Sequence, residues 1–265
     1  MSAPPPVAVA LQGPLAIVTL QRAPVNAIDE AWLACLDIAL GAVERAESVA
    51  ALLVRSSERQ FCAGADLDLM RSRFDTPEGR TRFVAFVREI QRVFARLEQL
   101  PKVTIAEIGG AALGGGLELA LACDLRLAAD GAKLGLPEAR LGLLPGAGGT
   151  QRLPRIVGDS TARRLILGAE VLTGGQAASL GLVHWSVPAA ELAARAAAIA
   201  ADLTSIPPAA LAECKRCLRA ALDPAVDGYA VELDATLALL ANGATQERVR
   251  AFLAKKRSSG KMAGP

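Results

Sequence analysis

Residues 109–152 read GGAALGGGLELALACDLRLAADGAKLGLPEARLGLLPGAGGTQR and combine a glycine triplet with two separated glutamates. The triplet, Gly114 to Gly116, follows a strand-like run over 103–108 and precedes an apolar helical run over 117–122. Glycine lets the backbone approach a ligand closely, and the first turn of a helix leaves N–H groups unpaired. This stretch therefore predicts a backbone-built anion site, suited to a phosphate or to a developing oxyanion.

The residues beside the triplet favour the oxyanion. No Lys-Ser or Lys-Thr pair follows it, so a phosphate loop of the ATPase kind is not supported. The glycine spacing does not match the dinucleotide fingerprint either. We therefore expect the unpaired N–H groups to stabilise negative charge that develops on a carbonyl oxygen.

The two glutamates of the stretch are candidates for acid–base chemistry. Glu118 lies in the first helical turn between apolar neighbours, where burial raises the pKa of an unpaired acid. Glu138 follows Pro137, which is also an ordinary way to open a helix. The residues alone leave a structural role open for both, as acids that favour the helix dipole. The glycine-rich run 145–150 that follows predicts a tight surface loop.

Three segments carry a resemblance to a known family: 61–67 (FCAGADL), 114–124 (GGGLELALACD) and 136–155 (LPEARLGLLPGAGGTQRLPR). Together they resemble the signature segments of the enoyl-CoA hydratase/isomerase family, the crotonases, in the family's order and at its separations. The similarity extends through nearly the whole chain, from 22–26 to 252–257. One glycine run alone would be weak evidence, but three long segments in order are specific.

The resemblance implies an α/β fold with a crotonase-type ββα spiral core and a helical C-terminal oligomerisation region. We expect the core, with the CoA-thioester site, over residues 1–188 and the helical region over 189–265, as one continuous fold. Members of the family assemble as trimers, often paired into hexamers, so a homotrimer or homohexamer is expected. The Ala- and Leu-rich runs 192–222 and 231–240 agree, because such an apolar surplus usually marks a subunit interface.

The same resemblance assigns roles to single residues. The backbone N–H groups of Ala65 and Gly115 form an oxyanion hole for the thioester carbonyl. Glu118 positions and deprotonates water while Glu138 delivers the α-proton, because hydration needs a base and an acid at once. The residues expected to bind the substrate and its CoA part are Ala63, Gly64, Asp66, Leu67, Gly114, Phe252 and Lys255, the last two at a neighbouring subunit's site, where the lysine pairs with a phosphate.

These roles imply an enoyl-CoA hydratase, a hydro-lyase that reversibly adds water across the 2,3-double bond of an enoyl-CoA thioester. No metal or other cofactor is expected, since coenzyme A is part of the substrate. Retention of both acids favours hydration, although isomerisation or another crotonase reaction stays open because a fold does not fix the chemistry. More distant alternatives are a noncatalytic member that binds acyl-CoA or RNA, and a structural protein whose glycines serve only as turns.

The overall composition limits the partners and the compartment. The chain has 265 residues, a net charge of +2 with both signs interleaved and few aromatic residues, so nucleic acid is not an expected partner. No run approaches the roughly 20 apolar residues of a membrane span and no signal core opens the chain, so we expect a cytoplasmic protein. The cysteines are expected to be reduced thiols, because a zinc site needs about four ligands and only 214 and 217 are close in sequence.

Apolar periodicity predicts the remaining elements of the core. A hairpin is expected where Gln12-Gly13-Pro14 separates two strand-like runs, and Asp29 is a plausible cap for the helix that comes next. The expected ranges are 7–11 and 15–20 for the hairpin strands, 28–46 for the first helix, 50–55 for a buried strand and 81–100 for a long helix.

Overall fold

The computed structural model describes residues 4–260, with side chains to residue 254. Contacts divide the chain into two compact units between Leu203 and Thr204. The boundary expected near Pro188 lies one helix earlier than this division. Helix α8 (Leu192–Thr204) belongs to the first unit because its apolar face is part of that unit's core.

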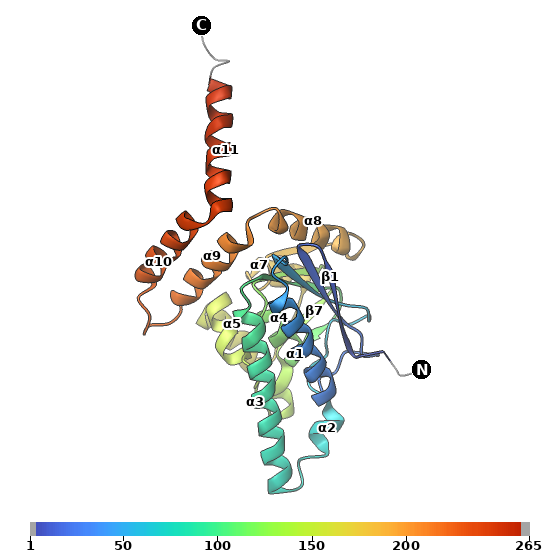
Figure 1. The fold of residues 1–265 in the computed structure, drawn as a ribbon. Helices are drawn as coiled ribbons and strands as arrows, with labels where there is room; N and C mark the ends of the chain where they lie inside the picture. The colour runs from blue at the N-terminus through green and yellow to red at the C-terminus, as the bar shows by residue number, and fades with distance from the viewer. Residues whose placement is uncertain (1–3, 261–265) are drawn as a thin grey trace. The chain divides into compact units, whose positions relative to one another are not determined.

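The first unit is built on a six-stranded sheet in the order β1-β2-β3-β4-β6-β9. Its first strand, β1, is labelled in Figure 1. β1 and β2 form the predicted antiparallel hairpin around Gly13, whose φ of +59° suits glycine. The other neighbouring strands pair in parallel, so a crossover segment joins each pair. The strands are β1 (Val7–Gln12), β2 (Leu15–Leu20), β3 (Ala51–Ser56), β4 (Val103–Ile108), β6 (Leu125–Ala129) and β9 (Trp185–Val187).

A second sheet brings the two predicted acids toward each other. It has the order β5-β7-β8, formed by β5 (Ala112–Leu113), β7 (Lys133–Gly135) and β8 (Val171–Thr173). β5 ends at the glycine triplet and β7 ends shortly before Glu138, and these two strands pair in parallel. Their carboxyl ends therefore meet at one edge of the sheet, which confirms the expected α/β spiral and fixes the site within it.

Helices cross over between the strands. α1 (Glu30–Arg45) begins after Asp29, whose side chain accepts the Trp32 N–H at 2.8 Å and so acts as the predicted cap. α3 (Pro77–Gln99) begins earlier than expected, because Thr76 caps it and Pro77 takes the first helical position. The other elements of this unit are α2 (Leu67–Arg71), α4 (Gly115–Leu121), α5 (Gly149–Val157), α6 (Asp159–Leu167), α7 (Gly174–Ser179) and the 3₁₀ turns η1 (Pro137–Leu141) and η2 (Ala189–Glu191).

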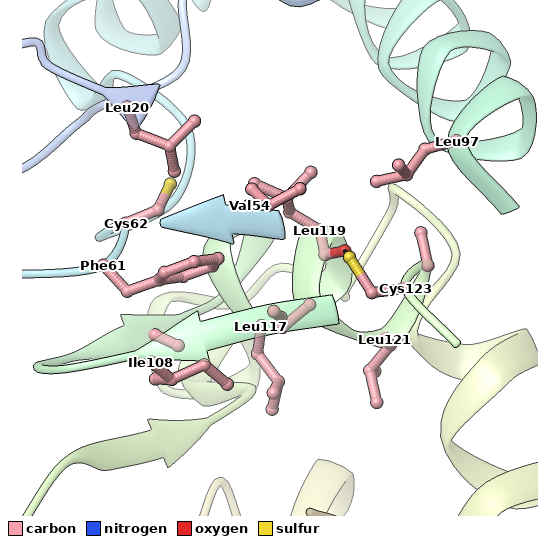
Figure 2. Close-up of a cluster of buried hydrophobic side chains, with 14 of the residues drawn as sticks. Leu20, Val54, Phe61, Cys62, Leu97, Ile108, Leu117, Leu119, Leu121 and Cys123 are labelled. Atoms are coloured by element: carbon pink, nitrogen blue, oxygen red, sulfur yellow. Dashed lines mark hydrogen bonds between the residues drawn. The ribbon is translucent and has the colours of Figure 1, made fainter. Parts of the chain in front are cut away.

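Helix α4 is buried on nearly all sides. Leu117, Leu119 and Leu121 are each at most 4% exposed, and Figure 2 shows them in one apolar cluster with Val54 of β3. A helix that is apolar all round lies inside the core rather than on its surface. Because Glu118 belongs to this helix, the burial of α4 also takes that carboxylate out of water.

The second unit is helical, with α9 (Pro208–Ala220), α10 (Gly228–Ala241) and α11 (Gly243–Gly260). α10 packs against both α9 and α11. Tyr229, Leu233, Leu237 and Leu240 recur along one side of α10 and are 63–82% exposed. No helix within residues 4–260 is long and apolar enough to cross a membrane.

Asn26 joins three segments next to the site. It is fully buried at a φ of +54°, a conformation that asparagine tolerates better than most residues. Its Nδ2 donates to Ser56 Oγ (2.8 Å) and to the Phe61 carbonyl (3.0 Å), and its Oδ1 accepts the Arg22 N–H (2.8 Å). The Cys62 thiol donates to the Asn26 carbonyl (3.0 Å). One residue thus fastens the end of β3 and the segment after Phe61 to the start of α1.

Loss of the Asn26 side chain should destabilise the protein by a measurable amount. Asn26→Ala removes these side-chain bonds and keeps a Cβ at positive φ, so we expect a loss of about 3–5 kcal/mol of unfolding free energy. Asn26→Gly removes the same bonds without the backbone strain and should lose about 1 kcal/mol less. Urea unfolding measures both variants, and wild-type midpoints in the two would show that the bonds contribute nothing.

Candidate active site

A single cavity of about 290 Å³ in the first unit contains most of the predicted site residues. Its lining combines the glycine-rich segments, both predicted acids and apolar side chains. The predicted residues that line it are Ala63, Gly64, Ala65, Leu67, Gly114, Gly115, Glu118 and Glu138.

The other three predicted binding residues are Asp66, Phe252 and Lys255, and of these Asp66 belongs to the first unit without lining its cavity. Asp66 caps α2, accepting the N–H groups of Asp68 (3.0 Å) and Leu69 (3.1 Å), and pairs with Arg22 at 2.9 Å. The hydrogen bond from Leu69 and then Arg22 hold the pKa of Asp66 below its usual range. Phe252 belongs to the second unit and is 67% exposed. The side chain of Lys255 lies outside the described residues.

The backbones at Ala65 and Gly115 lie against each other at the cavity wall. A Cβ on Gly115 would stand 3.5 Å from Ala65 N, and one on Gly64 would stand 3.2 Å from Gly115 N. Gly64 has a φ of +98°, which only glycine adopts readily. The close approach of these two chains therefore depends on the absence of side chains at both glycines.

The N–H groups of Ala65 and Gly115 have no protein acceptor in the described part of the chain. Ile28 bridges to the Ala65 segment in parallel, donating to Gly64 O (2.8 Å) and accepting from Asp66 N (2.9 Å). This parallel bridge uses the Gly64 carbonyl and the Asp66 N–H, and the Ala65 N–H between them stays unused. Gly115 opens α4, where a first-turn N–H has no partner in the helix. Two unused donors thus lie side by side.

Glu118 is held by two backbone N–H groups. The residue is 2% exposed, and its Oε1 accepts from Ala147 N (2.8 Å) and Gly149 N (2.7 Å). Burial raises the pKa of Glu118 to about 7, against the two backbone hydrogen bonds and Arg152, which lower it. The negative charge of Glu138 raises it further. A carboxyl group with this pKa can serve as a base at neutral pH.

The prediction of a surface loop over 145–150 is wrong. Pro145, Ala147 and Gly149 are buried, and the run supplies both donors to Glu118. A Cβ on Gly149 would stand 2.8 Å from Pro145 Cβ and 3.0 Å from Glu118 Oε1, so glycine is needed there for close approach rather than for a turn. A backbone N–H donor requires no particular residue type, so the sequence does not mark it. The alternation of glycine with other small residues in this run was the only available signal.

Glu138 lies in the first turn of η1 and faces the glycine triplet. A Cβ on Gly114, which has a φ of +52°, would stand 2.8 Å from Glu138 Oε1. Its Oε2 is buried and has no hydrogen-bond partner among the described residues. Burial raises the pKa of Glu138, which its own backbone N–H partly offsets. Burial therefore makes the protonated form of Glu138 easier to populate than that of a free carboxyl group.

The rest of the cavity wall is apolar and was largely unassigned from sequence. On α3, Phe83, Val87 and Ile90 recur at helical spacing and face it together, a signal that could have been found in the sequence. None of the described residues that line the cavity is Lys, Arg or His. The remaining lining residues are Ile28, Met70, Leu113, Pro137, Leu141, Leu143, Leu144, Gly146 and Ala147.

Known proteins are similar to this chain in sequence and in fold. The enoyl-CoA hydratase/isomerase family model matches residues 11–259. The Bacillus subtilis protein YngF, named as an enoyl-CoA hydratase/isomerase, is 37% identical over 247 residues, 92% of this chain and 93% of YngF. The short-chain-enoyl-CoA hydratase of Clostridium acetobutylicum is 35% identical over 252 residues, 94% of this chain and 95% of that protein. The structure of Pseudomonas aeruginosa DspI has a TM-score of 0.88 at 35% identity, covering 96% of each chain.

The family match and the relatives span nearly the whole chain, and the fold agrees with them. The cavity, with its paired acids and unused N–H groups, lies inside the matched region. This chain belongs to the enoyl-CoA hydratase/isomerase family, the crotonases.

Proposed function

We propose that this protein is an enoyl-CoA hydratase, which adds water reversibly across the 2,3-double bond of an enoyl-CoA thioester. One observation carries the proposal: the buried Glu118 and the half-buried Glu138 share a cavity with the unused N–H groups of Ala65 and Gly115. Hydration needs donors for the carbonyl oxygen, a base for water and an acid for the α-carbon. The name of the clostridial relative, a short-chain-enoyl-CoA hydratase, supports the same reaction.

In this mechanism the thioester oxygen accepts hydrogen bonds from the Ala65 and Gly115 N–H groups. Glu118 removes a proton from water, whose oxygen bonds to C3 of the substrate. The electrons of the double bond move toward the carbonyl and form an enolate, which the two donors stabilise by about 3–4 kcal/mol each. Glu138 then gives its proton to C2, the carbonyl re-forms, and the pair of acids again holds one proton.

The electrostatics of the acids support this division of roles. With burial raising the pKa of both groups, and Glu138 raising that of Glu118, the doubly ionised pair is disfavoured at neutral pH. Only Glu118 receives backbone N–H bonds from another segment, and these favour its ionised form. We assign the base to Glu118 on these two donors, and the acid to Glu138, whose Oε2 has no hydrogen-bond partner among the described residues.

The cavity lining also supports a substrate class, namely enoyl esters with an uncharged, apolar acyl chain. A second carboxylate on the acyl chain would enter a cavity that already holds two acids and whose described lining offers no basic side chain. An unpaired charge removed from water costs several kcal/mol. Hydrocarbon chains gain instead from contact with Phe83, Val87 and Ile90.

We also propose assembly as a homotrimer or homohexamer. The exposed apolar side of α10 supports burial against another subunit. Phe252, exposed on α11, and Lys255 are proposed to complete a neighbouring subunit's CoA site, where the lysine would pair with a phosphate.

A panel of CoA thioesters tests the function and the substrate class. We expect hydration of crotonyl- and trans-2-hexenoyl-CoA, followed by loss of the enoyl absorbance, with a kcat/KM at least about 100-fold above that for glutaconyl-CoA. Faster conversion of 3-hexenoyl-CoA to the 2-enoyl ester would indicate an isomerase. Binding of every ester without turnover would indicate a noncatalytic member.

The two glutamates should determine the turnover rate rather than the affinity for the CoA ester. Glu118→Gln and Glu138→Gln are each expected to lower kcat for crotonyl-CoA by about 10²–10⁴-fold, with KM changed only a few-fold. In the wild type, kcat/KM should rise with pH through about 7, because Glu118 must be ionised to accept a proton from water. Steady-state kinetics from pH 5 to 9 checks both points, and near-normal hydration by one variant would remove that residue from the mechanism.

The buried Glu118 carboxylate should lower the free energy of unfolding at neutral and alkaline pH. Its folded pKa of about 7 exceeds the ordinary value of 4.5, so stability is lost as the pH rises between these values. Above pH 7 the cost is about 3 kcal/mol, and Glu118→Gln, which can still accept the two N–H bonds, removes it. Thermal unfolding should show Glu118→Gln more stable than wild type at pH 8 and nearly equal at pH 4.5. A pH-independent difference would contradict the buried charge.

A further inference from the structure

The loop that binds Glu118 is itself held from its outer side. Gln91 of α3 donates from Nε2 to the Gly146 carbonyl at 2.6 Å. Arg152 of α5 donates from Nη1 to the Ala147 carbonyl at 3.0 Å. The Gly148 carbonyl accepts the backbone N–H groups of Gln151 (3.1 Å) and Arg152 (2.8 Å) at the start of α5. Three successive carbonyls of the loop are therefore bonded.

Peptide geometry links these outer bonds to the carboxylate. In a trans peptide the C=O of one residue and the N–H of the next point in opposite directions, and the only cis bond among the described residues precedes Pro24. The Ala147 N–H shares its peptide with the Gly146 carbonyl, and the Gly149 N–H shares its peptide with the Gly148 carbonyl. A bond to either carbonyl thus sets the direction of an N–H that binds Glu118 Oε1.

Arg152 connects the loop to α3. Its side chain is 10% exposed, and Nε and Nη2 both donate to Glu98 Oε2 on α3, at 3.0 and 2.8 Å. This fork anchors the guanidinium on a long helix while Nη1 holds the middle peptide of the loop. A Cβ on Gly148 would stand 2.1 Å from Nη1, so glycine at this position leaves room for the arginine.

We propose that Arg152 and Gln91 are positioning residues for the hydration reaction: Gln91 of α3 fixes the peptide that carries the Ala147 N–H, and Arg152 of α5 fixes the peptide between the two whose N–H groups hold the base Glu118. The proposal rests on the proposed function for its kinetic consequence, although its structural part concerns the carboxylate alone. Both donors bind Oε1, and Oε2 has no donor among the described residues, which leaves that oxygen for the water that Glu118 would deprotonate.

The charges around Glu118 add a second effect for Arg152. Glu138 on η1 raises the pKa of Glu118 and Arg152 on α5 lowers it, while α3 contributes Glu98, which neutralises part of the arginine charge. Gln91 is uncharged. A variant at Gln91 therefore tests the direction of the donors alone, whereas a variant at Arg152 tests direction and charge together.

The experiment measures the titration of Glu118 directly, by carboxyl ¹³C NMR of the intact protein labelled at glutamate, with the signal assigned from Glu118→Gln. Arg152→Gln should raise the titration midpoint of Glu118, Arg152→Lys should restore it in part, and Gln91→Ala should raise it without any change in charge. Arg155→Gln is the matched control, because Arg155 is an exposed arginine of the same helix, and its midpoint should equal that of the wild type.

Kinetics with crotonyl-CoA gives the second readout. Arg152→Gln should lower kcat by about 10–100-fold with KM within a few-fold, less than loss of a direct donor, and should move the acid limb of kcat/KM to higher pH. Wild-type midpoints in folded Arg152→Gln and Gln91→Ala overturn the proposal, and if Arg152→Gln does not fold, Arg152→Lys and Gln91→Ala decide it. A wild type without hydratase activity but with the expected midpoint changes would remove the proposed function and keep the positioning role.

Discussion

The arrangement of the first unit depends on two backbone hydrogen bonds to one oxygen. Glu118 sits in a helix that is otherwise apolar, and the N–H groups of Ala147 and Gly149 are its only described hydrogen-bond donors. These two hydrogen bonds offset part of the free-energy cost of burying the carboxylate, and the pKa of Glu118 is about 7. A fully hydrogen-bonded carboxylate would be too weak a base, and an unbonded one would stay protonated. The balance between burial, which raises the pKa of Glu118, and the two N–H donors, which lower it, sets the basicity of this carboxylate.

The glycines of the site follow from the same constraint. Backbone donors reach a buried group only where no side chain intervenes, so segments from different parts of the chain must touch. A Cβ on Gly116 would stand 2.0 Å from the Cys62 carbonyl, and one on Gly149 would meet both Pro145 and the carboxylate. The glycine-rich composition of the stretch therefore reflects packing of backbone on backbone as much as turn formation.

The cavity brings charge and hydrocarbon together. Two acids line it alongside aliphatic and aromatic side chains, among them those of α3 and of the segment after η1. Stability is given up at Glu118, a carboxylate with a raised pKa that is kept in the core, and the large apolar cluster around α4 provides the compensation.

The sequence by itself determined the family, the α/β spiral, the hairpin and the cap at Asp29, because turn glycines, caps and apolar periodicity are local signals. It also selected Glu118, Glu138, Ala65 and Gly115, through motifs that the fold brings into one cavity. Tertiary structure alone decided that residues 145–150 are a buried donor loop, that Asp66 pairs with Arg22, and that Arg152 of α5 pairs with Glu98 of α3. These are long-range contacts of backbone atoms or of ordinary charged side chains. Their residue types give no sign of the partner, since the partner is set by which strands pair and which helices pack.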